Sequence, residues 1–296
     1  MIAAAFARTI PTIGGILVAM ALVALIEVAM PLHARGRWNH FHLRPNLALT
    51  FLTFATNTFL NAALLATLWL HAKHVGLLGI IALPPLTAGV IGVLALDFSF
   101  YVAHVAMHRV PTFWRYHRVH HADPAVDVTT TIRQHPGESV IRYVFMAVFA
   151  FAFGVSPVAF AVYRLLSVLN GLLEHANIRM PLWLDSALSL VTTWPYTHKI
   201  HHSRIAAETN SNYGNIVSLF DRLFGTFTPS KRGVNVGYGL DGFDEPALQT
   251  TAGLLAMPFR QMTTIARIAG RPVATTCHAR PASCEAYTAP STATAT

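Results

Sequence analysis

The stretch Trp114-Arg115-Tyr116-His117-Arg118-Val119-His120-His121 carries the pattern His-x-x-His-His, and residues 198–202 repeat it. A histidine pair with a spacing of four, His104 and His108, precedes both. Residues three and four positions apart share one face of a helix, so each pattern directs two or three imidazoles toward one point. Neutral imidazole is the commonest metal ligand near neutral pH. Eight histidines in three such patterns therefore indicate a metal site that holds more than one ion.

The composition indicates a chain embedded in a membrane. Of its 296 residues, 53% are hydrophobic and only 11% are charged, whereas a soluble domain carries about 25% charged residues. The formal net charge of +8 fits contacts with anionic lipid headgroups. No compact basic segment stands apart from the apolar runs, so we expect no nucleic-acid partner. The two cysteines, Cys277 and Cys284, form no Cys-x-x-Cys motif, which argues against a cysteine zinc site or a redox dithiol.

The apolar runs predict an all-α, polytopic membrane protein with about four to five transmembrane or re-entrant helices and a cytoplasmic helical cap that carries the histidine patterns. The runs cover residues 10–32, 46–70, 77–103 and 140–173, and one crossing takes about 20 residues. Pro84 and Pro85 break the third run. The fourth run is interrupted at residues 154–157 and predicts a helical hairpin that returns to the side it left. Counting crossings places the histidine patterns inside, in agreement with the positive-inside rule.

Four parts of the chain follow from this division. We expect N-terminal transmembrane helices over residues 1–76, and a domain that carries the histidine patterns over residues 77–245. Residues 246–269 form an amphipathic C-terminal helix. Residues 270–296 are rich in Ala, Thr and Pro, a composition that cannot bury a core and predicts a disordered tail.

The hairpin would bring further polar residues back to the histidine patterns. We expect His175 there, and His135 in the loop before the hairpin. Ten candidate metal ligands result: His104, His108, His117, His120, His121, His135, His175, His198, His201 and His202. Metal-bound imidazole commonly donates its other N–H to a carboxylate or carbonyl. Asp97 and Glu138 are therefore candidates for orienting the rings, with Asn177 a weaker one. The alternatives are helix–helix pairing for Asp97 and turn chemistry for Asn177.

Eight to ten imidazoles exceed the coordination of one ion, so the sequence predicts two. Ligand type alone leaves Fe, Zn, Cu and Ni open. The Glu-x-x-His pattern of soluble diiron helical bundles is absent.

The three patterns and their surroundings resemble the membrane-bound fatty acid hydroxylase / sterol desaturase superfamily. The resemblance covers roughly residues 85–230 and includes residues 97–109, 114–121, 127–138, 175–181, 212–215 and 221–226. It implies a catalytic domain of the fatty acid hydroxylase type over 77–245, two non-haem Fe ions as cofactors, and use of O2. It also implies hydroxylation or desaturation of a lipid such as a sterol or a fatty acyl chain, with electrons from a separate cytochrome b5-like or ferredoxin-type donor. In one departure, some members carry a further histidine four residues before the position of His175, where this chain has Gly171.

Two other classes of function stay open at this point. An integral-membrane metal-binding or metal-transport protein without oxygenase activity would place its ligands along a pore rather than at one edge of the membrane. A membrane zinc hydrolase would need about three ligands and a general base, which leaves most of the histidines unexplained. Four basic residues, Arg109, Arg115, Arg118 and Lys199, could dock an acidic electron donor or contact lipid headgroups.

Overall fold

Five long helices form the body of the molecule. This computed structural model describes residues 2–34, 38–71, 76–81 and 83–260. The five are α1 (Ile2–Ala29), α2 (Trp38–His71), α4 (Pro85–Arg109), α6 (Pro136–Phe153) and α7 (Pro157–His175). Each is long and apolar enough to cross a membrane, and large apolar side chains such as Val18, Phe59 and Val148 stay exposed on them. The described residues form no β-strands beyond isolated bridges, so the predicted all-α, polytopic membrane fold is confirmed.

Proline and glycine set the helix boundaries. Pro85, Pro136 and Pro157 each occupy the first turn of a helix, where the missing N–H costs nothing. Gly154 ends α6 with a φ of 69°, a left-handed conformation that glycine adopts without a steric penalty. The break expected at residues 154–157 therefore does separate two antiparallel helices. The short α3 (Leu77–Ile80) follows Gly76, which lies so close to this turn that a Cβ atom would come within 2.2 Å of the Gly154 nitrogen.

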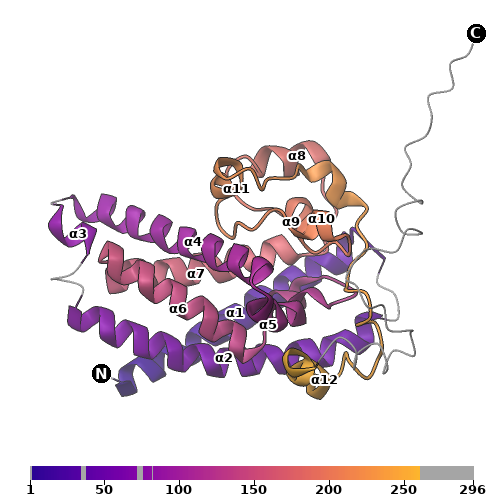
Figure 1. The fold of residues 1–296 in the computed structure, drawn as a ribbon, viewed down its shortest axis with the longest axis horizontal. Helices are drawn as coiled ribbons and strands as arrows, with labels where there is room; N and C mark the ends of the chain where they lie inside the picture. Colours follow the sequence, from indigo (N-terminus) through magenta and orange to yellow (C-terminus); the bar gives the residue numbers. More distant parts are fainter. Residues whose placement is uncertain (1, 35–37, 72–75, 82, 261–296) are drawn as a thin grey trace, which may run out of the picture.

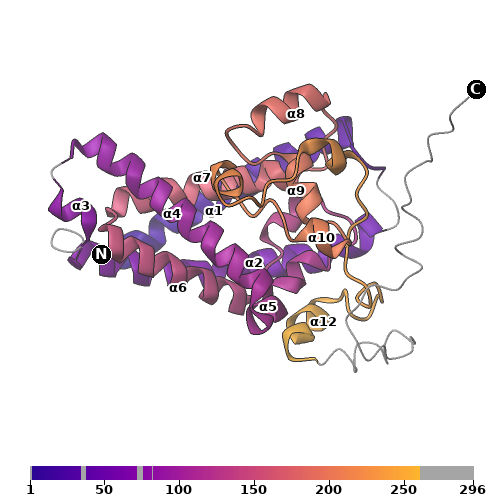
Figure 2. The same ribbon diagram turned by 45° about the horizontal axis from the view of Figure 1, so that its top comes forward.

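Short helices cap one end of the long ones. They are α5 (Pro111–His121), η1 (Val128–Ile132), α8 (Leu182–Leu188), α9 (Pro195–His201), α10 (Ala206–Thr209), α11 (Leu219–Leu223), η2 (Ser230–Val234), α12 (Thr251–Ala256) and η3 (Met257–Phe259). Figure 1 shows α8 to α11 gathered over one end of the long helices, with α3 at the opposite end. The view turned by 45° keeps this separation (Figure 2).

The structure describes residues 246–260 of the predicted C-terminal amphipathic helix, 246–269. Within this part α12 spans six residues, and a separate 3-10 turn that begins at Met257 and contains Pro258 follows it. Leu254 and Met257 are buried in a cluster with Leu49 and Val119, so this segment packs into the protein. Residues 261–269 and the predicted disordered tail, 270–296, lie outside the described residues.

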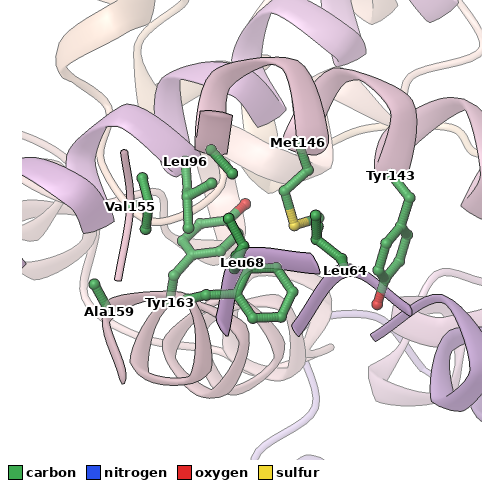
Figure 3. Close-up of a cluster of buried hydrophobic side chains, with 10 residues drawn as sticks. Leu64, Leu68, Leu96, Tyr143, Met146, Val155, Ala159 and Tyr163 are labelled. Atoms are coloured by element: carbon green, nitrogen blue, oxygen red, sulfur yellow. The ribbon is translucent and has the colours of Figure 1, made fainter. Parts of the chain in front are cut away.

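An apolar cluster joins α2, α4, α6 and α7 at the end away from the cap. Leu68, Leu96 and Tyr163 are fully or almost fully buried in it, and Figure 3 shows how these side chains fill the space between the helices. Inside a membrane, lipid tails are as apolar as these side chains, so close packing rather than removal from water holds such helices together. The cluster fixes the spacing of the hairpin and of α4, which carries the first histidine pair.

A buried polar network ties the cap to α2. The Arg133 side chain has no exposed surface and donates to the Val119 carbonyl at 3.0 Å, to Asn46 Oδ1 at 2.7 Å and to Gln249 Oε1 at 2.7 Å. Asp123, also fully buried, accepts from the Asn46 amide at 2.9 Å and lies 4.0 Å from Arg133. The positive charge of Arg133 holds the pKa of the Asp123 carboxyl well below its usual value, against the opposing effect of burial. This network links residues from α2, α5, the η1 segment and the loop before α12.

Replacing Arg133 with methionine is expected to destabilise the protein by about 3–5 kcal/mol, because it removes a permanent positive charge from a buried network. The Asp123 carboxylate would keep only its contact with His42, at 3.3 Å, as a positive partner among the described residues, and the Asn46 and Gln249 oxygens would lose their donor. The thermal unfolding midpoint of the purified protein in detergent measures this loss. Arg115→Met, at an exposed position, is the matched control and should change the midpoint little. Equal midpoints for the two variants would show that the network contributes no stability.

Candidate metal centre

Four segments bring nine histidines to the capped end of the long helices. His104 and His108 come from the last two turns of α4, and His175 is the last residue of α7. The helices α5 and α9 supply the two His-x-x-His-His patterns. Because α6 and α7 form a hairpin, His175 returns to the same end as α4, as the sequence predicted.

The nine histidines form two adjacent groups. The five-histidine group contains His104, His108, His117, His121 and His201. The four-histidine group contains His120, His175, His198 and His202. In each group, one ring nitrogen from every residue lies within 4.8 Å of the corresponding nitrogen of every other residue.

Neighbouring histidines in each pattern point into different groups. On α5, His121 joins the five-histidine group and His120 joins the other; at α9, His201 and His202 divide in the same way. The rings of His121 and His202 stack across the boundary at 4.6 Å between centroids. Residues four apart stay together because they lie on the same face of a helix. Each His-x-x-His-His pattern thus contributes to both groups.

The outer nitrogens of several rings are occupied by hydrogen-bond acceptors. The Nδ1 atoms of His104, His175 and His201 each lie 2.8 Å from a backbone carbonyl, of Tyr213, Gly171 and Ser211 respectively. A carbonyl oxygen only accepts, so these Nδ1 atoms carry the proton. In a neutral ring, the Nε2 atom then presents a lone pair. These lone pairs point into the two groups.

The distances between inner nitrogens fit metal coordination. In the five-histidine group, the Nε2 atoms of His104 and His121 lie 3.0 and 3.1 Å from that of His117. In the other, the Nε2 atoms of His198 and His120 lie 3.0 and 3.1 Å from that of His175. Two imidazole nitrogens bound at right angles to one ion, each about 2.1 Å away, would be about 3.0 Å apart. The buried His201 Nε2 has no hydrogen-bond partner in the described part of the chain. Converging lone pairs at these separations repel one another unless a cation lies between them, so the residues fit a pair of metal ions.

Burial keeps these rings uncharged near neutral pH. It lowers the pKa of His201 to about 4 and the pKa of His120 to about 3. For His117, His121 and His198 the pKa also lies well below its usual value, chiefly because of burial and then because of neighbouring histidines. Neutral imidazole is the form that binds metal.

Gly171 explains why the groups differ in size. The five-histidine group has two pairs with a spacing of four, whereas in the second group His175 lacks a partner at residue 171. A Cβ atom on Gly171 would meet the Thr131 methyl group at 3.0 Å, and the Thr131 hydroxyl donates to the Gly171 carbonyl at 3.1 Å. The Glu174 carboxylate is buried beside this gap, 3.8 Å from His198 Nε2. Glu174 is thus the acidic side chain nearest to the four-histidine group.

The three residues expected to orient the rings have different surroundings. Glu138 Oε1 lies 3.1 Å from His117 Nδ1 without the alignment of a hydrogen bond, a position from which a carboxylate can orient a metal-bound imidazole. Asp97 instead accepts hydrogen bonds from the backbone nitrogens of Ile216 and Val217 at 3.2 and 3.1 Å. It therefore anchors the loop that follows Tyr213, and contacts no ligand ring itself.

Asn177 has a similar anchoring role. Its side-chain oxygen accepts from the His33 backbone nitrogen, and its side-chain nitrogen donates to the His33 carbonyl, both at 2.9 Å. The backbone N–H of Asn177 donates to the Glu27 carboxylate at 2.9 Å. Asp221 was not singled out from the sequence, yet its carboxylate accepts from the backbone nitrogens of Tyr213 and Gly214. It thereby fixes the carbonyl that bonds His104. Asp221 lies in residues 221–226, one of the segments that resemble the family, and this resemblance could have identified it.

The structure does not bring His135 to either group. Its Nδ1 accepts from the Gly137 nitrogen at 2.9 Å and caps α6, and its ring packs against Tyr116 and Phe259. His135 therefore caps α6 and belongs to neither group.

Two of the four basic residues considered for docking are buried. Arg118 donates to the carbonyls of Met257 and Arg260. Lys199 has no exposed surface and donates to the carbonyls of Val126 and His175 at 2.9 and 2.6 Å, and burial lowers its pKa to about 8. Both hold loops around the histidines, which leaves Arg109 and Arg115 as the exposed pair.

A cavity of about 940 Å³ leads from the histidines between the long helices. Both histidine groups line it, through His104 and His117 from one and His120, His175 and His198 from the other. Apolar and small side chains from α1, α2, α6 and α7 form most of the remaining wall. The arrangement can hold a long apolar molecule with one part of it against both groups.

Comparisons with known proteins agree with this site. Residues 89–226 match the family model of the fatty acid hydroxylases. The ornithine lipid hydroxylase OlsE of Rhizobium tropici is 29% identical over 153 residues, 52% of this chain and 45% of that protein. The alkylglycerol monooxygenase of Xenopus tropicalis is 31% identical over 147 residues, 50% of this chain and 31% of the relative. A cholesterol 25-hydroxylase-like protein of Danio rerio is 28% identical over 137 residues, 45% of this chain and 52% of the relative.

The chain spans about half the length or less of these curated relatives. No solved structure matches it significantly. The matched region begins inside α4 and ends after α11, so it contains all nine grouped histidines. Residues 89–226 thus form a region of the fatty acid hydroxylase type, similar to the membrane-bound fatty acid hydroxylase / sterol desaturase superfamily.

Proposed function

We propose that this protein is a membrane-bound diiron oxygenase that uses O2 and external electrons to hydroxylate a C–H bond of a lipid. The observation that carries the proposal is the meeting of two histidine groups at the inner end of a cavity that opens between membrane-spanning helices. The hydroxylase and monooxygenase relatives support the same reaction class. Desaturation of the lipid is the closest alternative outcome of the same site.

The proposed ligands are the nine grouped histidines. His104, His108, His117, His121 and His201 would hold one ion, and His120, His175, His198 and His202 the other. Two bound ferrous ions would supply the binding and reduction of O2. The choice of iron rests on the family, because imidazole alone also suits Zn, Cu and Ni.

The chain's own residues would perform three tasks. Backbone carbonyls and Glu138 hold the imidazoles in one orientation through their outer nitrogens. Small and apolar side chains in the cavity exclude water, which limits side reactions of reactive oxygen. The shape of the cavity would position one carbon of the lipid against the histidines that line its end, which come from both groups.

Electrons would reach the site from a separate carrier of the cytochrome b5 or ferredoxin type. Trp114 packs against the rings of His108 and His121, at 5.0 and 5.5 Å between centroids. The exposed Arg109 and Arg115 flank this position and would attract an acidic protein. We place this face on the cytoplasmic side because the loops at the capped end carry most of the Arg residues.

Metal binding or transport without oxygenase activity is the competing proposal. A transporter would need ligands along a pore across the membrane, but the described histidine groups lie together at one end.

Incubation of the reduced protein with 18O2 and membrane lipids tests the proposal. We expect one labelled oxygen atom in a lipid alcohol, detected by mass spectrometry, and no label with H2(18)O. A lipid alkene formed only with O2 would assign desaturation. Oxygen-independent conversion of the lipid, or no conversion by protein that carries its metals and accepts electrons, would contradict it.

A further inference from the structure

Two arginines line the cavity within the membrane-spanning helices. Arg142 is on α6 and Arg164 on α7, and both face the space that ends at the histidines. A charged side chain in this part of a membrane is costly, and such residues usually pair with another charge or mark a functional site. Neither arginine belongs to the histidine groups. Arg142 reaches them only through Glu138, and no hydrogen bond or ion pair among the described residues links Arg164 to them.

Their guanidinium groups are poorly paired among the described residues. Arg142 lies 3.8 Å from Glu138 Oε1 and 4.3 Å from the centre of the Phe100 ring. Arg164 lies 5.3 Å from the centre of the Tyr143 ring, and its buried Nε atom has no hydrogen-bond partner in the described part of the chain. Each guanidinium offers five N–H donors in a planar fork that suits carboxylate and phosphate oxygens. Among the described residues, Arg142 thus has one carboxylate partner at 3.8 Å and no ion pair is found for Arg164, which leaves donor capacity on both guanidinium groups.

The cavity wall around the arginines is also polar. Ser139 Oγ and Asn57 Oδ1 are buried without a hydrogen-bond partner in the described residues, and both line the same space. Asn61, another lining residue, accepts from the Tyr143 hydroxyl at 2.5 Å. A sterol ring or a plain hydrocarbon chain would leave these groups unsatisfied, at a cost of about 1–3 kcal/mol for each buried polar group. The wall therefore favours a ligand with a charged or strongly polar portion inside the cavity.

We propose that the cavity binds a lipid whose anionic group, a carboxylate or a phosphate, lies between Arg142 and Arg164. This inference rests on the proposed oxygenase function and specifies its substrate class. Arg142 is one helical turn from Glu138, which contacts His117. The anionic group would consequently lie close to the histidines, and the carbon that reacts would be a few bonds away from it. The hydrocarbon tail would extend along the apolar wall toward α1 and α2.

Binding of matched lipid pairs to the metal-loaded protein in detergent tests this inference without requiring turnover. The probes are 1-oleoyl-lysophosphatidic acid against 1-oleoylglycerol, and oleate against oleyl alcohol, with retention measured by native mass spectrometry. We expect the anionic member of at least one pair to bind about 10-fold more tightly, which corresponds to about 1.4 kcal/mol. The preferred pair would distinguish a phosphate from a carboxylate.

Variants of Arg164 assign the effect to the cavity. Arg164→Gln should remove the preference for the anionic probe and leave binding of the neutral probe unchanged, whereas Arg164→Lys should retain part of it. Arg115→Gln, an exposed cation outside the cavity, is the control for general attraction of anions and should behave as the wild type. Equal binding of charged and neutral probes, or an anionic preference that survives in Arg164→Gln, would overturn the inference. Labelled lipid alcohol from 18O2 together with equal binding of the charged and neutral probes would reject the substrate class and keep the reaction. Preferential binding of an anionic probe without any oxygen-dependent product would reject the reaction.

Discussion

Alanine at His201 or at His198 is expected to abolish lipid oxidation, by at least about two orders of magnitude. His201 belongs to the five-histidine group and His198 to the four-histidine group. Even residues that only orient a metal ligand typically change affinity or activity by 10–100-fold, and these two are proposed to bind the ions directly. Product formation per chain under O2, measured by mass spectrometry, gives the activity. Metal analysis of the same samples should show that each variant loses mainly the ion of its own group.

His135→Asn is the matched control for both variants. His135 lies outside both groups and caps α6 through its Nδ1, a role that asparagine also fills well. We expect this variant to retain both ions and most of its activity. If His135→Asn were as inactive as His201→Ala, the assignment of ligands by proximity would be wrong.

Acidification is expected to destabilise the metal-free protein strongly below about pH 6.5. Burial lowers the pKa of His201 from 6.5 to about 4 and that of His120 to about 3. Between pH 6.5 and 4 the unfolded chain therefore binds more protons than the folded chain, and the free energy of unfolding falls as the pH falls. For His201 alone the loss is on the order of 3 kcal/mol, since one pKa unit corresponds to about 1.4 kcal/mol.

Thermal unfolding midpoints of the metal-free protein between pH 8 and pH 5 measure this effect. The midpoint should be nearly constant above pH 7 and should fall progressively below pH 6.5. A His201→Asn variant, with one fewer buried imidazole, should show a shallower decrease. A midpoint that stays flat down to pH 5 would mean that the rings are not held in a buried, neutral state.

Hydrophobic periodicity and proline placement were sufficient to predict most of the helical framework. Pro84-Pro85 and the break at residues 154–157 correctly marked the start of α4 and the turn between α6 and α7. The return of His175 to the other histidines follows from that hairpin alone. These features depend on local sequence, so local reasoning could find them.

The assignment of individual histidines depended on contacts that the sequence does not encode locally. His120 and His121 are adjacent, yet they serve different groups, because the positions of α4 and α9 relative to α5 decide which ring meets which. The sequence around His135 predicted a metal ligand, but in the structure its side chain caps α6. The burial of Arg118 and Lys199 was likewise unexpected, since their partners are carbonyls from distant loops.

The metal content of the purified, unmodified protein tests the central claim most directly. Two irons per chain are expected from elemental analysis, with one lost when His198 or His201 is replaced. A single zinc ion per chain, unaffected by either replacement, would contradict a two-ion site built from these nine histidines.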